Sequence, residues 1–214
     1  MKKIKITALI LCASMLAGTA GCNTTDKTNE TSLSQTEAVT EASSEDTQAV
    51  TENTEQVVTD SGVDFLEGYE KFELTSTDLV NGVWADIISY DRGNNVSPEL
   101  SWEPVEGASC YVIYMVDVSA NSFLHWVQGD ITQTKLPEGF AEKRDYIGPY
   151  PPSGTHQYNI YVIALRNPVK RVKGGINSPW PELPEFIKYL ETDKDGNTGN
   201  VIAAGKITGL YKSK

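Results

Sequence analysis

Two histidines are the side chains best suited to chemistry at neutral pH, and the sequence contains no others. His125 and His156 each stand at or near the start of an apolar run, where a buried ring needs a hydrogen-bond partner. A single buried histidine is most often a satisfied core residue. Asp117 changes that expectation, because it places a carboxylate inside the apolar run 111–118, and a histidine is its natural partner.

A tyrosine and a rigid loop complete a candidate pocket. Side chains alternate along a strand, so we expect Tyr158 on the same face as His156, with Gln157 pointing the other way. The preceding segment 148–154 reads GPYPPSG; its prolines fix the backbone and its glycines allow a ligand to approach closely. The imidazoles, the phenol and backbone N–H groups of this loop would bind an anion such as phosphate. Asp117 would fix the tautomer of a histidine or raise its pKa.

The elements that must position these residues are mainly β-strands. Runs rich in β-branched and aromatic residues are separated by breakers such as 92–95 and 137–139. The run 111–118 is almost continuously apolar, which predicts a central strand buried on both faces. Further strands are predicted at 65–74, 82–90, 123–131, 156–165 and 201–211, and one short helix at 184–191. This order favours a mainly β, sandwich-like domain with a helix packed late.

The N-terminus predicts export and a lipid anchor. Three lysines precede the uncharged, mostly apolar run 6–18, as in a secretory signal peptide, and the run is too short to span a bilayer. Small residues then lead to Cys22, which resembles the lipidated cysteine of a bacterial lipobox, although Thr19 stands where leucine is usual. We therefore assign residues 1–22 to a lipoprotein signal peptide and expect the mature protein on the outer face of the cell membrane. The alternative is an ordinary cleaved signal in which Cys22 has no role.

The next segment predicts a tether. Residues 23–60 contain nine acidic residues, one lysine and no aromatic residue, so we expect them to be disordered. Residues 61–214 then form one domain, with 20 acidic and 14 basic residues and a net charge of −6. Such a charge disfavours a nucleic-acid partner and means that any anion site is local. Cys110 is the only cysteine in this domain, so no internal disulfide can form there.

Three separated segments combine the candidate residues in a distinctive order. They are 95–102 (NVSPELSW), 115–127 (MVDVSANSFLHWV) and 148–158 (GPYPPSGTHQY). Together they resemble the signatures of the phosphatidylethanolamine-binding protein family, also called the Raf kinase inhibitor-like family, and especially its bacterial branch. The resemblance extends from about Phe65 to the C-terminus. It implies a sandwich of antiparallel β-sheets with a short helix near the C-terminus, and a pocket for phosphate or phosphoethanolamine-like headgroups.

The resemblance also implies a set of ligand-binding residues, and this sequence departs from part of it. The family's first signature reads D-P-D-A-P, whereas here Ser119 replaces the second acid and both prolines are absent. Gln157 replaces the usual basic residue between the histidine and the tyrosine. Because the lost acid would repel an anion, we expect this site to tolerate a fully ionised anion better. The predicted ligand-binding residues are Asp117, Ser119, His125, Gly148, Pro149, His156 and Tyr158.

The main functional prediction is a binding module for a small anion or phospholipid headgroup, with no cofactor, metal or catalytic residue. A second hypothesis is that the domain binds and inhibits a protease or another extracytoplasmic enzyme. A third is an enzyme in which His125, His156 and Asp117 hold a metal or act as acid and base. Against it, Ser153 does not stand in a G-x-S-x-G nucleophile motif. The segment 193–197 lacks the glycine and glutamate spacing of a calcium loop and is interpreted as a turn.

Overall fold

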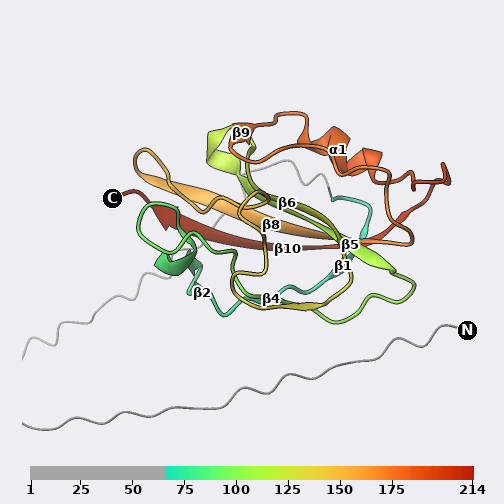
Figure 1. Ribbon diagram of the computed structural model, residues 1–214, viewed down its shortest axis with the longest axis horizontal. Helices are drawn as coiled ribbons and strands as arrows, with labels where there is room; N and C mark the ends of the chain where they lie inside the picture. Colours follow the sequence, from blue (N-terminus) through green and yellow to red (C-terminus); the bar gives the residue numbers. More distant parts are fainter. Residues whose placement is uncertain (1–65) are drawn as a thin grey trace, which may run out of the picture. The chain divides into compact units, whose positions relative to one another are not determined.

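The computed structural model describes residues 66–214 (Figure 1). The predicted signal peptide, the lipidation site Cys22 and the tether 23–60 lie outside these residues. Within the described part, no helix is long and apolar enough to span a bilayer. The strands are β1 (Glu70–Phe72), β2 (Leu79–Val80), β3 (Val83–Trp84), β4 (Leu100–Ser101), β5 (Cys110–Asp117), β6 (Phe123–Ile131), β7 (Lys135–Leu136), β8 (Thr155–Leu165), β9 (Ser178–Pro179) and β10 (Val201–Lys212). The helices are α1 (Leu183–Tyr189) and two 3₁₀ turns, η1 (Asp86–Ile88) and η2 (Val118–Ala120).

The four long strands and the helix confirm the predicted mainly β fold. All eight residues of β5 are buried, and this strand lies between β8 and β6 in the larger sheet, as its apolar run predicts. The order of that sheet is β2-β3-β10-β8-β5-β6-β9, with β1 also paired to β10. A second, two-stranded sheet is formed by β4 and β7.

The larger sheet is mixed, whereas the expected sheets were antiparallel. Both β1 and β3 pair with β10 in the parallel sense, β1 along residues 203–205 and β3 at Leu210. Parallel neighbours need a long crossover, and here almost the whole domain separates the paired segments. Nothing in the local sequence of such short segments indicates which distant strand they will join.

The predicted strands at 65–74 and 82–90 are much shorter than expected. After β3 the chain turns into η1, and its backbone groups bond within the following loop: Asn94 N donates to Ile87 O and Asn95 N to Ser89 O. A Cβ at Gly93 would lie 1.8 Å from Asp86 O, so the loop folds back tightly on η1. The apolar residues of 82–90 therefore pack as a loop rather than as a strand.

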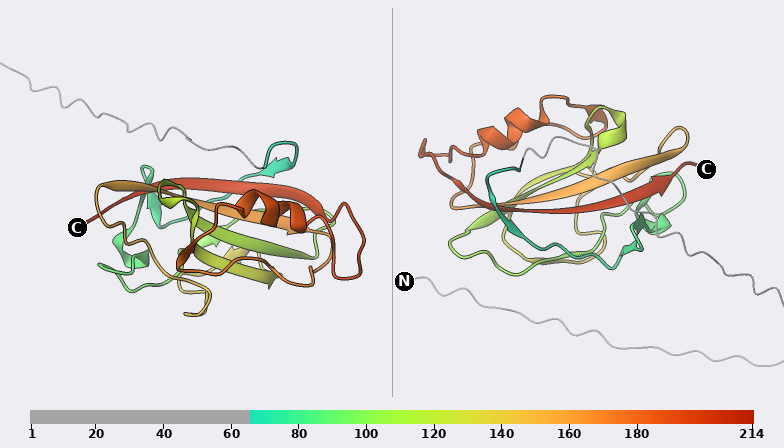
Figure 2. Two further views of the ribbon diagram at one scale, coloured as in Figure 1. Left: turned by 90° about the horizontal axis from the view of Figure 1, so that it is seen from above. Right: turned by 180° about the vertical axis from the view of Figure 1, so that it is seen from behind.

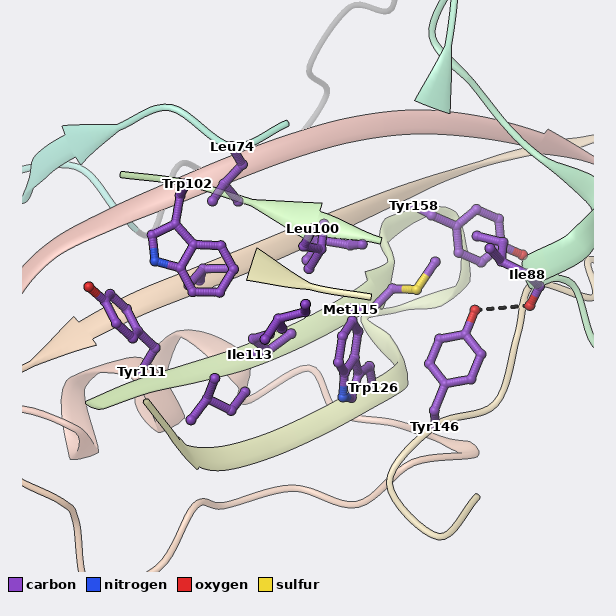
Figure 3. Packing of buried hydrophobic residues seen from close by; sticks show 14 of the residues in the cluster. Leu74, Ile88, Leu100, Trp102, Tyr111, Ile113, Met115, Trp126, Tyr146 and Tyr158 are labelled. Atoms are coloured by element: carbon purple, nitrogen blue, oxygen red, sulfur yellow. Dashed lines mark hydrogen bonds between the residues drawn. The ribbon is translucent and has the colours of Figure 1, made fainter. Parts of the chain in front are cut away.

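Two hydrophobic layers cover the two faces of the larger sheet. One is rich in aromatic residues, and Figure 3 shows part of it, with Trp102 against Tyr111 and Trp126 near Met115. The small β4–β7 sheet and the loops lie over this face (Figure 1). The other layer is mainly aliphatic and is covered by α1, which crosses over the strands in Figure 2. Side chains of β5 and β8 alternate between the two layers, so each long strand supports both.

Candidate functional site

A cavity of about 370 Å³ lies at the end of β5, where η2 begins. Its walls come from β5, η2, β6, β8 and the loop before β8. The strand register explains the convergence, because Asp117 is paired with Phe123 of β6 on one side and Tyr158 of β8 on the other. The lining residues are Asp117, Ala120, Phe123, His125, Tyr150, Pro151, Pro152 and Tyr158.

Asp117 is a buried carboxylate with both oxygens hydrogen-bonded. Oδ2 lies 2.6 Å from Nδ1 of His156, and Oδ1 accepts a hydrogen bond of 2.9 Å from the backbone N–H of Ser119. Only 3% of the residue is exposed, so the two donors replace the water that it loses on folding. The pairing of this aspartate with a histidine was expected from the sequence. The second bond also caps η2, which fixes the direction of the chain as it leaves β5.

His125 lies inside the cavity wall and is held in one orientation. Its Nδ1 lies 2.8 Å from the carbonyl oxygen of Ile147, which can only accept, so this nitrogen carries the proton. Nε2 is then an acceptor in the neutral ring and becomes a donor only when the ring is charged. Burial lowers the pKa of His125, and contacts with the backbone of Ile147 and Gly148 oppose that effect. The ring packs edge-on against Tyr158, with centroids 5.1 Å apart.

The hydroxyl of Tyr158 is the unusual group of the site. It is buried and has no partner at hydrogen-bond geometry among the described residues. Burial, and then the nearby charge of Asp117, raise the pKa of Tyr158 far above its ordinary value, so the hydroxyl keeps its proton. Asp117 and the backbone of Tyr150 thus lie close enough to affect the phenol without forming a well-directed bond. An unsatisfied donor of this kind costs about 1–3 kcal/mol and needs a reason.

The loop at 148–154 is fixed by its first residue. Gly148 N donates a hydrogen bond of 2.7 Å to Asn95 Oδ1, and a Cβ at Gly148 would lie 2.0 Å from Ile88 O. Only glycine fits between the loop and η1. This N–H is therefore bonded within the protein, and whether other backbone N–H groups of the loop bind a ligand stays a prediction. Further along the loop, Tyr150 donates a hydrogen bond of 2.6 Å to Asn177 and packs against the exposed ring of Tyr90.

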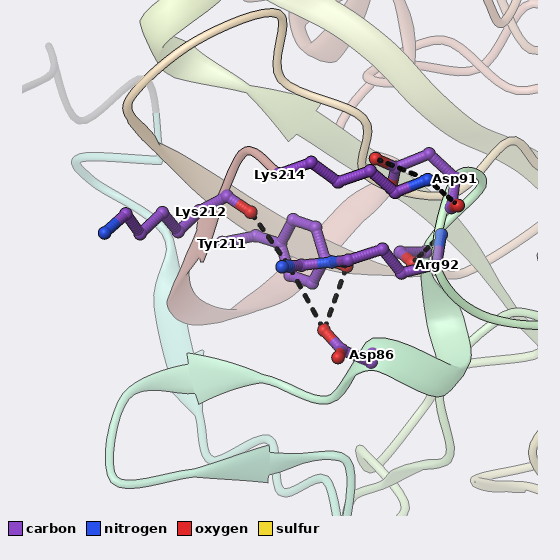
Figure 4. A network of polar contacts seen from close by, with 7 residues as sticks. Asp86, Asp91, Arg92, Tyr211, Lys212 and Lys214 are labelled. Carbon is purple, nitrogen blue, oxygen red and sulfur yellow. Dashed lines mark hydrogen bonds and ion pairs between the residues drawn. The ribbon is translucent and has the colours of Figure 1, made fainter.

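A polar network connects the segment 86–95 to the C-terminal end of the chain (Figure 4). Arg92 Nε donates a hydrogen bond of 2.7 Å to the hydroxyl of Tyr211, and the guanidinium lies 3.1 Å from Asp86 Oδ1. Tyr211 in turn donates to Asp86 over 3.0 Å, and Lys214 contacts Asp91. The end of β10 therefore anchors the loop whose Asn95 holds Gly148.

The structure brings all the predicted ligand-binding residues to one end of the sheet, but they divide into two groups. Asp117, His125 and Tyr158 line the cavity. The other four do not line it. His156 is bonded to the carboxylate of Asp117, Ser119 Oγ accepts a hydrogen bond of 3.0 Å from Gln157 N, and Gly148 and Pro149 are bonded through the loop backbone. Whether any of them binds a ligand stays a prediction.

Sequence reasoning missed the apolar part of the wall. Phe123 precedes His125 by two positions in β6, so the alternation of a strand could have identified it. Tyr150, Pro151 and Pro152 stand in the segment 148–154, for which the sequence predicted a role of the backbone and not of these side chains. Among residues 66–214, no group of three or more His, Cys, Asp or Glu side chains is arranged to hold a metal ion. The cavity thus combines a phenol and an imidazole with a largely aromatic and proline-lined wall.

The chain is similar to several known proteins. The model of the phosphatidylethanolamine-binding protein family matches residues 74–212. A UPF0098 protein of Aquifex aeolicus is 31% identical over 170 residues, which cover 69% of this chain and 92% of the relative. A UPF0098 protein of Methanothermobacter thermautotrophicus is 28% identical over 141 residues, covering 56% of this chain and 85% of the relative.

Two solved structures share the fold. One is a putative phosphatidylethanolamine-binding protein homologue from Chlamydia trachomatis, with a TM-score of 0.52 and 21% identity over 68% of this chain and 99% of that one. The other is E. coli YbcL, with a TM-score of 0.51 and 23% identity over 67% of this chain and 99% of that one. At this identity they show the fold alone. With the match of the family model over most of the described residues, the chain belongs to the phosphatidylethanolamine-binding protein family.

Proposed function

We propose that this protein binds a small anion, phosphate or a phosphorylated headgroup, in the cavity at the end of β5 without transforming it. The observation that carries the proposal is the buried, unpaired hydroxyl of Tyr158 beside His125. The hydroxyl is buried, so a side chain of the cavity wall would have to move before a phosphoryl oxygen could accept from it. That contact would satisfy a donor that is costly to leave without a partner. The nearest carboxylate, Asp117, is already bonded by His156 and Ser119, which lessens its repulsion of an anion.

His125 gives the proposed binding a proton dependence. Its Nδ1–H is committed to Ile147, so the neutral ring offers an acceptor on Nε2. A protonated phosphate can donate to that nitrogen, whereas a fully ionised anion needs the imidazolium. Because burial lowers the pKa of His125, binding of such an anion would be accompanied by proton uptake.

The apolar wall favours an anion that carries a carbon group. Phe123, Tyr150 and Pro151 line one side of the cavity and offer no charged partner. A bare phosphate would leave this surface in contact with water, whereas the carbon part of a phosphorylated headgroup would cover it. Phosphoethanolamine should therefore bind more tightly than inorganic phosphate, provided that its ammonium group lies over the ring of Phe123 or Tyr150 or reaches water.

We also propose that the domain is held at the outer face of a membrane by acylation of Cys22, with residues 23–60 as a tether. Two acyl chains would suffice, since each buried CH₂ contributes roughly 0.8 kcal/mol. The test is labelling of cells with an alkyne fatty acid, followed by fractionation. Wild-type protein should carry the label and sediment with membranes, and Cys22→Ala should lose both properties. An unlabelled, freely secreted wild-type protein would refute the anchor.

Binding can be measured on the histidine rings, because the chain has only two. We would titrate inorganic phosphate and then phosphoethanolamine into the full chain and follow the imidazole C–H signals by NMR, assigning them with His156→Gln. The signals of His125 should shift saturably and more than those of His156, because His125 lines the cavity whereas His156 contacts it only through Asp117. Tyr158→Phe should weaken binding about tenfold. Absence of any shift with either probe would refute the anion site, and conversion of phosphoethanolamine during the titration would refute a purely binding role.

A further inference from the structure

A second cavity, of about 350 Å³, lies beside α1 and shares no lining residue with the first. Its walls come from the segment before β9, from Trp180 directly after β9, and from two residues of α1, a helix that lies over the sheet in Figures 1 and 2. The lining residues are Arg171, Lys173, Gly174, Trp180, Phe186 and Tyr189. The cavity thus joins two cations to three aromatic rings.

The two cations have no carboxylate partner. Among residues 66–214, neither Arg171 nor Lys173 forms an ion pair; Lys173 Nζ instead lies 3.9 Å from the centroid of the Tyr189 ring. This is unexpected in a domain with more acids than bases. Residues 146–181, which precede α1, contain four basic residues and no acidic one. An anionic group would find two charged donors there that are not paired with a carboxylate.

The aromatic wall is half-buried and fixed. Trp180 and Phe186 pack with ring centroids 5.4 Å apart, and the indole Nε1 donates 2.8 Å to Gly175 O. Gly174 has φ +96°, a backbone conformation that residues with a side chain rarely adopt. The loop lies so close to α1 here that a Cβ built on Gly174 would be 3.2 Å from the ring of Phe186. The rings therefore form one side of a concave site rather than protruding side chains that could enter a bilayer.

We propose that this cavity is a second ligand site, for a carboxylate joined to a flat apolar group. Arg171 and Lys173 would bind the carboxylate, and Trp180 with Phe186 would hold the apolar part. A cavity of this volume is within the range of small-molecule sites. The proposal does not depend on the anion site at β5, because it rests on other residues and on other contacts.

The probe is N-acetyl-phenylalanine, which has both parts, and its matched control is N-acetyl-phenylalanine amide, which lacks the charge. Each is titrated into the full chain while the four indole N–H signals are followed by NMR, with Trp180→Phe assigning the relevant one. The acid should shift the Trp180 signal saturably, and the amide should bind at least about tenfold more weakly. Equal binding of acid and amide would overturn the proposal, because the cations would then have no role.

The matched variants separate this site from a general charge effect. The double variant R171Q/K173Q should lower the affinity for N-acetyl-phenylalanine about tenfold or more. Lys170→Gln removes an exposed cation that adjoins the cavity without lining it, and it should leave the affinity unchanged. An equal loss in both would overturn the proposal. A second result would also overturn it: the wild type does not respond to N-acetyl-phenylalanine but binds phosphatidylglycerol vesicles, and the double variant does not bind them. The surface would then be a membrane contact.

Discussion

The two cavities are nearly equal in volume, about 370 and 350 Å³, but the charged side chains in one are paired within the protein and those in the other are not. At the end of β5, the carboxylate of Asp117 is buried and both of its oxygens are bonded inside the protein. Beside α1, Arg171 is exposed and Lys173 is half-buried, and their charges are not matched by any carboxylate of the described residues. One site is completed by internal bonds and the other is left open to a partner.

The difference follows from where each cavity is built. The first lies between the ends of three long strands, where the register fixes every side chain and burial penalises an unpaired charge. The second lies between a short helix and an irregular segment at the surface, where water can solvate a cation at little cost. Apart from Gly174, whose φ is positive, substitutions should therefore affect stability strongly at the first cavity and weakly at the second.

The largest effect is expected at Gly148. Replacement by alanine places a Cβ 2.0 Å from the backbone oxygen of Ile88, which cannot move without displacing η1. We expect a loss of about 3 kcal/mol or more in the free energy of unfolding, measured by urea denaturation. Gly175, next to the second cavity, has open space around its Cβ position and no positive φ, so Gly175→Ala should change stability by less than about 0.5 kcal/mol. Similar losses in both variants would show that the two regions are equally constrained.

The next effect compares a buried charge with a half-buried one. Asp117→Ala leaves His156 and the N–H of Ser119 without their acceptor and should cost about 2 kcal/mol. Lys173→Ala removes a contact with the ring of Tyr189 and should cost less than about 1 kcal/mol. Both values come from urea unfolding at one pH. If Lys173→Ala costs as much as Asp117→Ala, the second cavity is part of the folded core rather than an open site.

The sequence predicted more of the first cavity than of the second, because its residues stand in periodic strands and in family signatures. Periodicity indicated that Tyr158 shares a face with His156, and the resemblance to the family implied that Asp117 and His125 lie beside them. The irregular segment before β9 has no period, and the charges of Arg171 and Lys173 gave no sign of converging with Trp180.

Two features of the first cavity were equally hidden. The tautomer of His125 is set by the carbonyl of Ile147, and a backbone carbonyl is present at every position of the sequence. The hydroxyl of Tyr158 has no hydrogen-bond partner, and this depends on the three-dimensional positions of its neighbours rather than on the sequence around it. The parallel pairing of β1 and β3 with β10 was hidden for a similar reason, because it joins distant segments that carry no local signal.

A smaller effect with an opposite sign is expected at Tyr158. Tyr158→Phe removes a hydroxyl that has no partner, so the free energy of unfolding should stay unchanged or rise by up to about 1 kcal/mol, while phosphate affinity falls. The matched control is Tyr146→Phe in the same layer. Its hydroxyl donates 2.9 Å to Ile88 O, as Figure 3 shows, so this variant should lose about 1–2 kcal/mol. A clear loss of stability in Tyr158→Phe would mean that the phenol is bonded internally, and the argument for an anion there would fail.

The smallest effect is a pH dependence that arises from His125. Burial lowers the pKa of His125 in the folded protein, whereas in the unfolded chain it should lie near its ordinary value of about 6.5. Between these values the unfolded chain binds more protons, so stability is full above about pH 6.5 and falls as the pH decreases. From about pH 7 to about pH 6 this residue should contribute a loss of at most about 0.7 kcal/mol.

The comparison variant is His125→Asn, whose amide N–H can still donate to Ile147 O but does not titrate. Urea unfolding of both proteins at the two pH values should give a shallower pH slope for the variant. Sulfate, whose charge is constant over this range, should also bind the wild type more tightly at the lower pH, because the bound anion favours the charged ring. An identical slope in both proteins would mean that His125 binds its proton equally well in the folded and unfolded states. The first cavity would then be open to water like the second, and the contrast between them would disappear.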